Sequence, residues 1–243
     1  MNQILIETQF KKIKNKGFIK SVGHGSSAVG RTFEKELGIW ENSLPYADYF
    51  GIEIKCLSRK EEDYITLFSL EPESIEGNVM INISEKYGYP DKDIKNINIL
   101  NTNVSNKIKY ISLKYKGYLM IDKINDNLQL LIENRNSQIV DTSAKWSLER
   151  LNYKIEDKCN YLALILTEKR IFNKVEYFKY KEIKIYKFKG MNKFIEAIEN
   201  GIVRVQFKIT VYKSGLKKGQ LHNHGTSFQI RAVDLEKIFE RVI

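Results

Sequence analysis

The chain has 243 residues, of which 42% are hydrophobic and 29% charged, as in ordinary soluble globular proteins, and it is long enough for one large core or two lobes sharing a cleft. Forty Lys and Arg against 30 Asp and Glu give a net charge of +10, which favours a polyanionic partner through counterion release. The sequence has no membrane-spanning stretch and no signal-peptide pattern, and its two cysteines lack zinc spacing, so we expect a cytoplasmic protein without disulfides.

The N-terminal region is predicted to lead into a short helix. Residues 1–20 are typical of a strand or a short helix with a basic face. The Gly- and Ser-rich residues 21–30 lack the Gly-Lys-Ser/Thr ending of a phosphate-binding loop and predict a turn. Ser26 or Ser27 is the expected N-cap of the helix that follows, and Gly38 is its expected end.

The rest of the chain is predicted to mix strands and helices. Alternating or strand-like runs, several of them bounded by turn residues, predict strands at 50–57, 63–70, 108–115, 118–121, 128–133, 202–212 and 228–230, and a continuous apolar run predicts a central strand at 159–166. Helices are expected at 142–155, 190–200 and 233–242. A basic, Gly-containing loop is expected at 214–224. This mixture predicts an α/β or α+β fold.

One segment carries a set of side chains suited to phosphodiester hydrolysis. Glu53 and Lys55 are two residues apart on a predicted strand, so their side chains leave the same face. Asp48 lies just upstream, where the chain turns into that strand. Neighbouring carboxylates suit Mg²⁺, which prefers oxygen ligands and retains several waters. A lysine beside them can stabilise the negative charge that develops on a phosphate.

The same spacing also occurs elsewhere in the chain. Glu156 and Lys158 form a second Glu-x-Lys triplet, and Glu182 and Lys184 form a third. In a chain this rich in Glu and Lys, such triplets are expected by chance, and alternating charge on a strand is usually a solvated face. The first triplet differs because apolar residues flank both Glu53 and the nearby Asp48, and because a helix carrying Glu34 precedes it.

A longer stretch around this segment resembles a known nuclease family. The sequence reads Gly30-Arg-Thr-Phe-Glu-Lys-Glu-Leu-Gly38, then Asn42-x-x-Pro45-x-x-Asp48, then Gly51-Ile-Glu-Ile-Lys55. This order resembles the MvaI/BcnI restriction endonucleases, and also the mismatch-repair nicking enzyme MutH and its Sau3A-type relatives. The resemblance implies the PD-(D/E)xK nuclease fold, a mixed sheet flanked by helices, with two lobes around a DNA cleft.

The resemblance also assigns roles to individual residues. Asp48 and Glu53 match the family's metal ligands, which implies Mg²⁺ as cofactor, and Lys55 matches its catalytic lysine. Glu34 matches the helix carboxylate that supports the metal site. The lobes are expected at about residues 1–140, for catalysis, and 141–243, for DNA recognition.

A second block near the C-terminus is similar to the MvaI/BcnI family in particular. It comprises Gly201-Ile-Val-Arg-Val-Gln-Phe-Lys208, a basic loop, and His222-Asn-His-Gly-Thr-Ser-Phe-Gln-Ile230. In the family this region approaches the major groove of double-stranded DNA. The resemblance and the local charge together imply a set of DNA-binding residues: Arg204, Gln206, Lys208, Lys217, Lys218, His222, His224, Gln229 and Arg231. Lys213 is a further candidate for phosphate contact.

The block departs from the family pattern at three positions. Gln206 and Lys208 align where the family carries Asp and Arg, and Gln229 stands where Arg is common. Arg favours guanine, an acid accepts a hydrogen bond from cytosine, and Gln favours adenine. We therefore expect a target other than the plain C/G-rich site CC-x-GG.

Several alternatives remain open at the level of sequence. His222 and His224 could bind metal, but with only His24 besides them a third ligand is hard to supply. The main expectation is a type II restriction endonuclease that works alongside a DNA methyltransferase, and the resemblance favours a monomer. The alternatives are a MutH-like strand-specific nickase and a non-catalytic protein that binds nucleic acid through charge alone. Abundant Ile, Lys, Asn and Tyr also fit AT-rich coding, which would explain the net charge without any partner.

Overall fold

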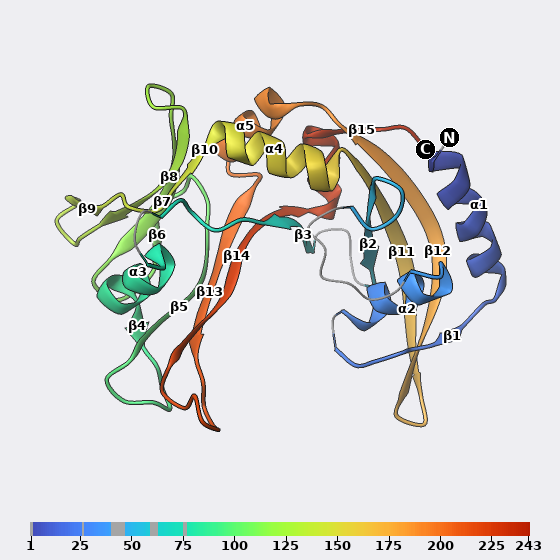
Figure 1. Ribbon diagram of the computed structural model, residues 1–243, viewed down its shortest axis with the longest axis horizontal. Coiled ribbons are helices and arrows are strands. Elements are labelled where there is room, and N and C mark those ends of the chain that lie inside the picture. Colours follow the sequence, from blue (N-terminus) through green and yellow to red (C-terminus); the bar gives the residue numbers. More distant parts are fainter. Residues whose placement is uncertain (1, 26, 40–46, 59–62, 75–76) are drawn as a thin grey trace. The chain divides into compact units, whose positions relative to one another are not determined.

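The computed structural model (Figure 1) describes residues 2–25, 27–39, 47–58, 63–74 and 77–243. Ser26, predicted as a cap, and Asn42 and Pro45 of the family-like stretch lie outside these residues. The chain forms two compact units: Met1–Ile65, Ile155–Lys189 and Arg231–Ile243 make the first, and Thr66–Lys154 and Gly190–Ile230 the second. No helix within the described residues has the length and apolarity needed to cross a membrane.

The first unit is built on a five-stranded mixed sheet. Its centre is a long antiparallel hairpin, β11 (Tyr161–Phe172) and β12 (Val175–Phe188). Strand β2 (Ile52–Leu57) lies parallel to β11, with Glu53 opposite Leu162. The two short strands β1 (Ile19–Lys20) and β15 (Phe239–Arg241) both pair antiparallel with β12.

Helices α1 (Asn2–Asn15) and α2 (Ala28–Glu36) pack on one face of this sheet (Figure 1). The buried side of α2 includes Val29 and Phe33, and the Phe33 ring lies 4.9 Å from the ring of Tyr180 on β12. The Tyr180 hydroxyl donates a 2.9 Å hydrogen bond to the carbonyl oxygen of Val29. This contact satisfies a buried hydroxyl and connects α2 to the sheet.

The two faces of strand β2 carry different kinds of side chain, apolar on one and charged on the other. Ile52 and Ile54 belong to the apolar core under α1 and α2, and Cys56 packs against that core. Because side chains alternate along a strand, Glu53 and Lys55 leave the opposite face. The predicted shared face of Glu53 and Lys55 is therefore confirmed.

The second unit contains two further sheets. One has the order β3-β14-β13-β5-β4, and the other β10-β8-β7-β6 with β9 beside β8. The strands of the first sheet are β3 (Tyr64–Ser69), β4 (Tyr89–Pro90), β5 (Asn98–Val104), β13 (Arg204–Val211) and β14 (Leu221–Arg231). Those of the second are β6 (Lys109–Tyr110), β7 (Lys116–Asp122), β8 (Asn127–Glu133), β9 (Ile139–Asp141) and β10 (Lys145–Ser147).

Aromatic residues dominate the core of the second unit. Phe228 of β14 stacks on Phe68 of β3 at 4.8 Å and meets the edge of Trp146 at 5.9 Å. Trp146 is fully buried, and its indole nitrogen donates to the Leu70 carbonyl at 2.9 Å. Helix α5 (Met191–Glu199) adds Phe194 to this cluster, and α3 (Val79–Tyr87) is a further helix of the unit.

The predicted mixed α/β class is confirmed, with corrections at particular elements. Residues 2–15 form a helix, the more helical of the two expectations for the N-terminus. Trp146 belongs to strand β10, and the helix predicted at 142–155 is α4 (Leu148–Cys159). The helix predicted at 233–242 is a 3₁₀ helix at Ala232–Lys237 followed by β15, which pairs with β12. Ser27 occupies the N-cap position of α2 without a capping hydrogen bond from its side chain.

The compact units differ from a division near residue 140. Each unit is assembled from separate segments of the chain, three in the first and two in the second. The catalytic candidates Asp48, Glu53 and Lys55 fall in the first unit, and β13 and most of β14 fall in the second. Sequence order alone does not reveal such interleaving, because it arises from strand pairing between distant segments, such as β2 with β11.

Candidate active site

A tight turn delivers Asp48 to the edge of β2. Phe50 and Gly51 both adopt positive φ, 47° and 80°, and the backbones of Tyr49 and Ile52 on either side exchange two hydrogen bonds. A two-residue turn of this kind favours glycine at its second position. The turn places the Asp48 side chain next to β2, where its Oδ2 accepts a 2.9 Å hydrogen bond from the backbone amide of Ile54.

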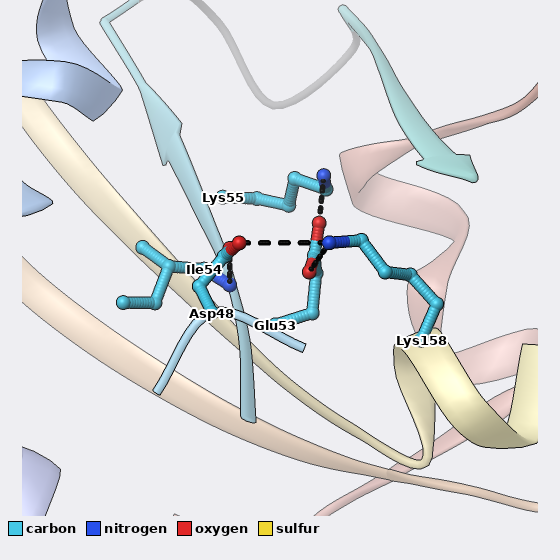
Figure 2. A network of polar contacts seen from close by, with 5 residues as sticks. All are labelled: Asp48, Glu53, Ile54, Lys55 and Lys158. Carbon is cyan, nitrogen blue, oxygen red and sulfur yellow. Dashed lines mark hydrogen bonds and ion pairs between the residues drawn. The ribbon is translucent and has the colours of Figure 1, made fainter. Parts of the chain in front are cut away.

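Two lysines bind the two oxygens of the Glu53 carboxylate. Lys55 Nζ lies 2.5 Å from Oε1, and Lys158 Nζ lies 2.8 Å from Oε2. Lys158 Nζ is also 3.5 Å from Asp48 Oδ1 (Figure 2). Only 3% of the Glu53 side chain is exposed, with 22% for Lys55 and 17% for Lys158. Two carboxylates and two ammonium groups therefore form one compact, largely buried cluster.

Burial and charge act in opposite directions on this cluster. Burial raises the pKa of Glu53, with Asp48 adding to the rise while Lys55 and Lys158 oppose it. Burial is the largest single influence and acts to lower the pKa of Lys55. The charge and hydrogen bond of Glu53, together with Cys159 and Asp48, outweigh it in sum, so the pKa of Lys55 is raised. Lys55 therefore stays a cation, as a group that stabilises phosphate charge must be.

Lys158 is a site residue that the sequence does not predict. It belongs to the Glu156-x-Lys158 triplet, a spacing that is expected by chance in a chain this rich in Glu and Lys. The triplet lies in the last turn of α4, and residues two apart on a helix do not share a face. Glu156 is exposed while Lys158 turns into the cluster. No local signal distinguishes this lysine, because its role depends on where α4 ends.

Glu34, predicted to support the metal site, is near enough to Cys56 for its charge to act on the thiol. Burial raises the pKa of the Cys56 thiol well above its usual value, and the charges of Glu34 and Asp48 raise it further, against Lys55. Cys56 is on the face of β2 that packs against α2, whereas Glu53 leaves the other face. Glu34 thus approaches β2 from the helix side. Cys56 and Cys159 are both free thiols, as expected.

The carboxylates of Asp48 and Glu53 suit a divalent cation. Both approach the same ammonium group, so the space between them is one that a positive charge can occupy. The described residues contain no cluster of three or more His, Cys, Asp or Glu side chains that would bind metal through protein ligands alone. Mg²⁺ typically uses one or two carboxylates and completes its shell with water and phosphate oxygens, which fits this pair.

The predicted DNA-binding residues gather on the paired strands β13 and β14 of the second unit. Arg204 lies opposite Gln229, Gln206 opposite Ser227, and Thr210 opposite His222. The neighbouring side chains of β13 that point the other way are buried and apolar: Val205, Phe207, Ile209 and Val211. This face of the ribbon is therefore polar, and Lys208 on it is exposed.

Gln229 is the buried centre of this polar face. Its Oε1 accepts a 3.0 Å hydrogen bond from Arg204 Nε, and its amide nitrogen donates to Gln206 Oε1 at 3.1 Å. A weaker 3.4 Å contact reaches Thr66 Oγ1. Only 8% of Gln229 is exposed. Its hydrogen bonds go to protein neighbours, so it fixes the orientation of Arg204 and Gln206.

The two histidines form a stacked group with an aromatic residue. His222 stacks on Tyr212 at 4.6 Å, and the His222 and His224 rings lie 3.9 Å apart. His224 Nε2 is 2.8 Å from Thr210 Oγ1. Burial lowers the pKa of His224, and the charges of His222 and Lys208 lower it further. The neutral form of His224 is thus favoured.

The remaining basic candidates differ in what they contact. Lys217 lies over the Tyr212 ring at 5.7 Å, and Lys218 is exposed on the same turn. Arg231 is paired with Asp234 at 2.6 Å. Lys213 is bound by Asp91 and Asp93, so its charge is already compensated within the protein.

Comparisons with known proteins bear on this arrangement. Residues 7–239 match the model of the MvaI/BcnI restriction endonuclease family. A solved structure described as a restriction endonuclease MvaI–cognate DNA substrate complex shares 27% identity, with 98% of this chain and 97% of that chain covered and a TM-score of 0.87. Restriction endonuclease MvaI in the absence of DNA shares 26% identity over 99% and 96% of the two chains, with a TM-score of 0.63. No curated protein matches significantly.

Proposed function

The chain belongs to the MvaI/BcnI restriction endonuclease family, and we propose that it hydrolyses phosphodiester bonds of double-stranded DNA at a short specific sequence with Mg²⁺ as cofactor. The observation that carries this proposal is the cluster of Asp48, Glu53 and Lys55 at β2, with all three side chains within one network of contacts. The similar MvaI structure is described as a complex with its cognate DNA, which supports double-stranded DNA as the partner.

The roles of the residues follow from their charges. Asp48 and Glu53 would hold the cation, which when bound polarises a phosphoryl oxygen and makes water a better nucleophile. Lys55, held as a cation by Glu53, stabilises the negative charge on the phosphate as the water oxygen bonds to phosphorus. The bond from phosphorus to one sugar oxygen then breaks, and that oxygen takes up a proton. Glu34 supports this site from the helix side of β2 through its charge.

We assign DNA recognition to the polar face of β13 and β14. The groups available to DNA there are Arg204, Gln206, Lys208, His222 and His224, while Lys217, Lys218 and Arg231 suit phosphate contacts. Gln229 contributes by orienting Arg204. Because Gln206 and Lys208 replace an acid and an arginine of the family pattern, the proposed target differs from CC-x-GG. Sequencing the ends of cleaved plasmid tests this, and ends that map to CC-x-GG would refute it.

In this proposal the first unit is catalytic and the second reads the sequence. One active site per chain cuts one strand, so a monomer would cut the two strands in turn. A DNA methyltransferase that protects the same sequence completes the biological role. The enzyme is expected to act in the cytoplasm.

Plasmid cleavage in the presence of Mg²⁺ tests the active site. Lys55→Ala and Glu53→Gln are expected to lower the cleavage rate by roughly a hundredfold or more, since the first removes the charge that stabilises the phosphate and the second removes the charge of a proposed metal ligand. Glu182→Gln is a matched control, because Glu182 belongs to a Glu-x-Lys triplet on β12 and is exposed. Unchanged cleavage by Lys55→Ala would disprove the site, and a wild-type protein that never cuts with Mg²⁺ would disprove the activity.

A further inference from the structure

The ammonium group of Lys158 occupies the space between the two proposed metal ligands. It lies 2.8 Å from Glu53 Oε2 and 3.5 Å from Asp48 Oδ1 (Figure 2). Lys55 contacts the other oxygen of Glu53, so the two lysines do not compete for the same atom. Lys158 contacts both carboxylates, and it comes from α4, not from the strand that carries the motif.

The charges of this cluster balance without any metal. Asp48 and Glu53 contribute two negative charges, and Lys55 and Lys158 contribute two positive ones. Adding a divalent cation would leave two uncompensated positive charges in a site where little of Glu53 is exposed to water. Such an excess is costly at low effective dielectric. The electrostatic cost of metal binding is therefore lowest if one lysine ammonium moves out of the cluster.

The two lysines come from different elements. Lys55 is on β2 itself, two residues from its partner, and its contact is made along one strand. Lys158 is in the last turn of α4, next to the helix end at Cys159, and reaches the carboxylates from outside that strand. Displacing Lys158 clears the space between the two carboxylates and leaves the contact of Lys55 with Glu53 in place.

We propose that Lys158 is a positioning residue that stands in for the metal: it holds the Asp48 and Glu53 carboxylates together before Mg²⁺ binds and is displaced when Mg²⁺ arrives. This inference rests on the proposed Mg²⁺ site. It implies that Lys158 weakens metal binding to the free protein. The negative phosphate of bound DNA offers the displaced ammonium a new partner, so DNA and metal strengthen each other's binding, as linkage requires.

Calorimetric titration of the DNA-free protein with Mg²⁺ alone tests the inference. Lys158→Met keeps the length of the side chain and removes its charge, so its Mg²⁺ affinity is expected to rise by about tenfold or more over wild type, from loss of a like charge within a few ångströms. Lys158→Arg keeps the charge and is expected to bind Mg²⁺ within about twofold of wild type. Lys12→Met, at an exposed position of α1, is the charge-matched control and should equal wild type.

The outcomes separate this inference from the proposed function. Glu53→Gln should abolish the binding; a Mg²⁺ affinity that Glu53→Gln leaves intact overturns the metal assignment and the inference with it. Binding that Glu53→Gln abolishes but that is equal or weaker in Lys158→Met than in wild type overturns the inference alone. Lys158→Gln, which can still donate to a carboxylate, replaces Lys158→Met if circular dichroism shows that the latter is unfolded.

Discussion

The Asp48 side chain accepts a hydrogen bond from the backbone of Ile54, six residues later, through Oδ2 at 2.9 Å. The bond holds the carboxylate against the backbone of the strand that carries Glu53 and Lys55. Asp48 therefore has a structural role, through Oδ2, and a proposed ligand role, through its charge. The two roles can be separated by substitution.

Asp48→Asn keeps an oxygen that can accept from Ile54 but removes the charge. We expect its free energy of unfolding to stay within about 0.5 kcal/mol of wild type and its cleavage rate to fall by roughly a hundredfold. Asp48→Ala also loses the hydrogen bond and should be about 1 kcal/mol less stable. Urea denaturation and plasmid cleavage measure the two effects. Equal stability losses in both variants would show that the bond to Ile54 contributes nothing.

The hydrogen bond between Tyr180 and Val29 is expected to stabilise the packing of α2 on the sheet. Tyr180→Phe removes the hydroxyl and leaves the Val29 carbonyl without that donor, so we expect a loss of about 1–2 kcal/mol in the free energy of unfolding. Tyr153→Phe is the control, because the Tyr153 side chain is exposed. Urea denaturation of both variants measures the loss. Equal midpoints for Tyr180→Phe and Tyr153→Phe would mean that water replaces the hydroxyl as the donor to the Val29 carbonyl.

Replacing Phe33 should have a larger effect than removing the Tyr180 hydroxyl. Phe33 is fully buried and contacts the rings of Phe10 and Tyr180. Phe33→Ala is expected to cost about 3–5 kcal/mol, from lost burial and the cavity that remains. Since Glu34 is the next residue on the same helix, the cleavage rate at saturating Mg²⁺ should fall as well. A loss below about 1 kcal/mol in denaturant titration would indicate that the core closes over the gap.

A substitution of Gln229 tests whether the orientation of Arg204 matters for DNA binding, because the hydrogen bonds of Gln229 go to protein neighbours. Gln229→Leu keeps much of the volume but removes the acceptor for Arg204 and the donor to Gln206, so we expect a stability loss of about 1 kcal/mol. Binding to the cognate sequence should weaken more than binding to unrelated DNA, because a freely rotating Arg204 reads bases less well. Gln220→Leu, at an exposed position, is the control. Equal weakening on both DNAs would argue that Arg204 contacts only phosphate.

The lowered pKa of His224 predicts that the free energy of unfolding depends on pH. Burial, followed by the charges of His222 and Lys208, lowers its pKa below the value near 6.5 of an unfolded chain. The unfolded state therefore takes up a proton first as the pH falls, so stability is highest above about pH 6.5 and declines between that pH and the lowered pKa. His224→Gln should lack this component. Urea midpoints of the two proteins at pH 7.5 and 5.5 measure the difference, and parallel declines would contradict the assignment.

The parts predicted well from sequence depend on local patterns. The strand at Glu53 and Lys55 follows from alternation over a few residues, and the turn before it from Gly51. The end of α2 near Gly38 follows in the same way, since Gly38 has a φ of 77°. These features are determined by neighbours in the chain, so a single sequence contains the signal.

The parts that were missed depend on distant partners. Residues 239–241 have no pattern that separates a helix from a strand, and they become β15 because β12 offers a free edge. Trp146 is in a strand because β10 pairs with β8, which places the indole over Phe207 and Phe228. Lys158 enters the active site because α4 ends beside β2. None of these partners lies within ten residues in the sequence.

The interleaving of the two compact units limits how new specificities can arise. Strands β13 and β14, proposed above to read DNA, lie in the sequence between two segments of the first unit. The last of these segments contains β15, which pairs with β12. A single crossover between two relatives at residue 190 would exchange part of both units, because Gly190–Ile230 belongs to the second unit and Arg231–Ile243 to the first. Changes of target sequence are therefore expected to accumulate as point substitutions on the polar face of the ribbon, and hybrid enzymes made with a single crossover should fold poorly.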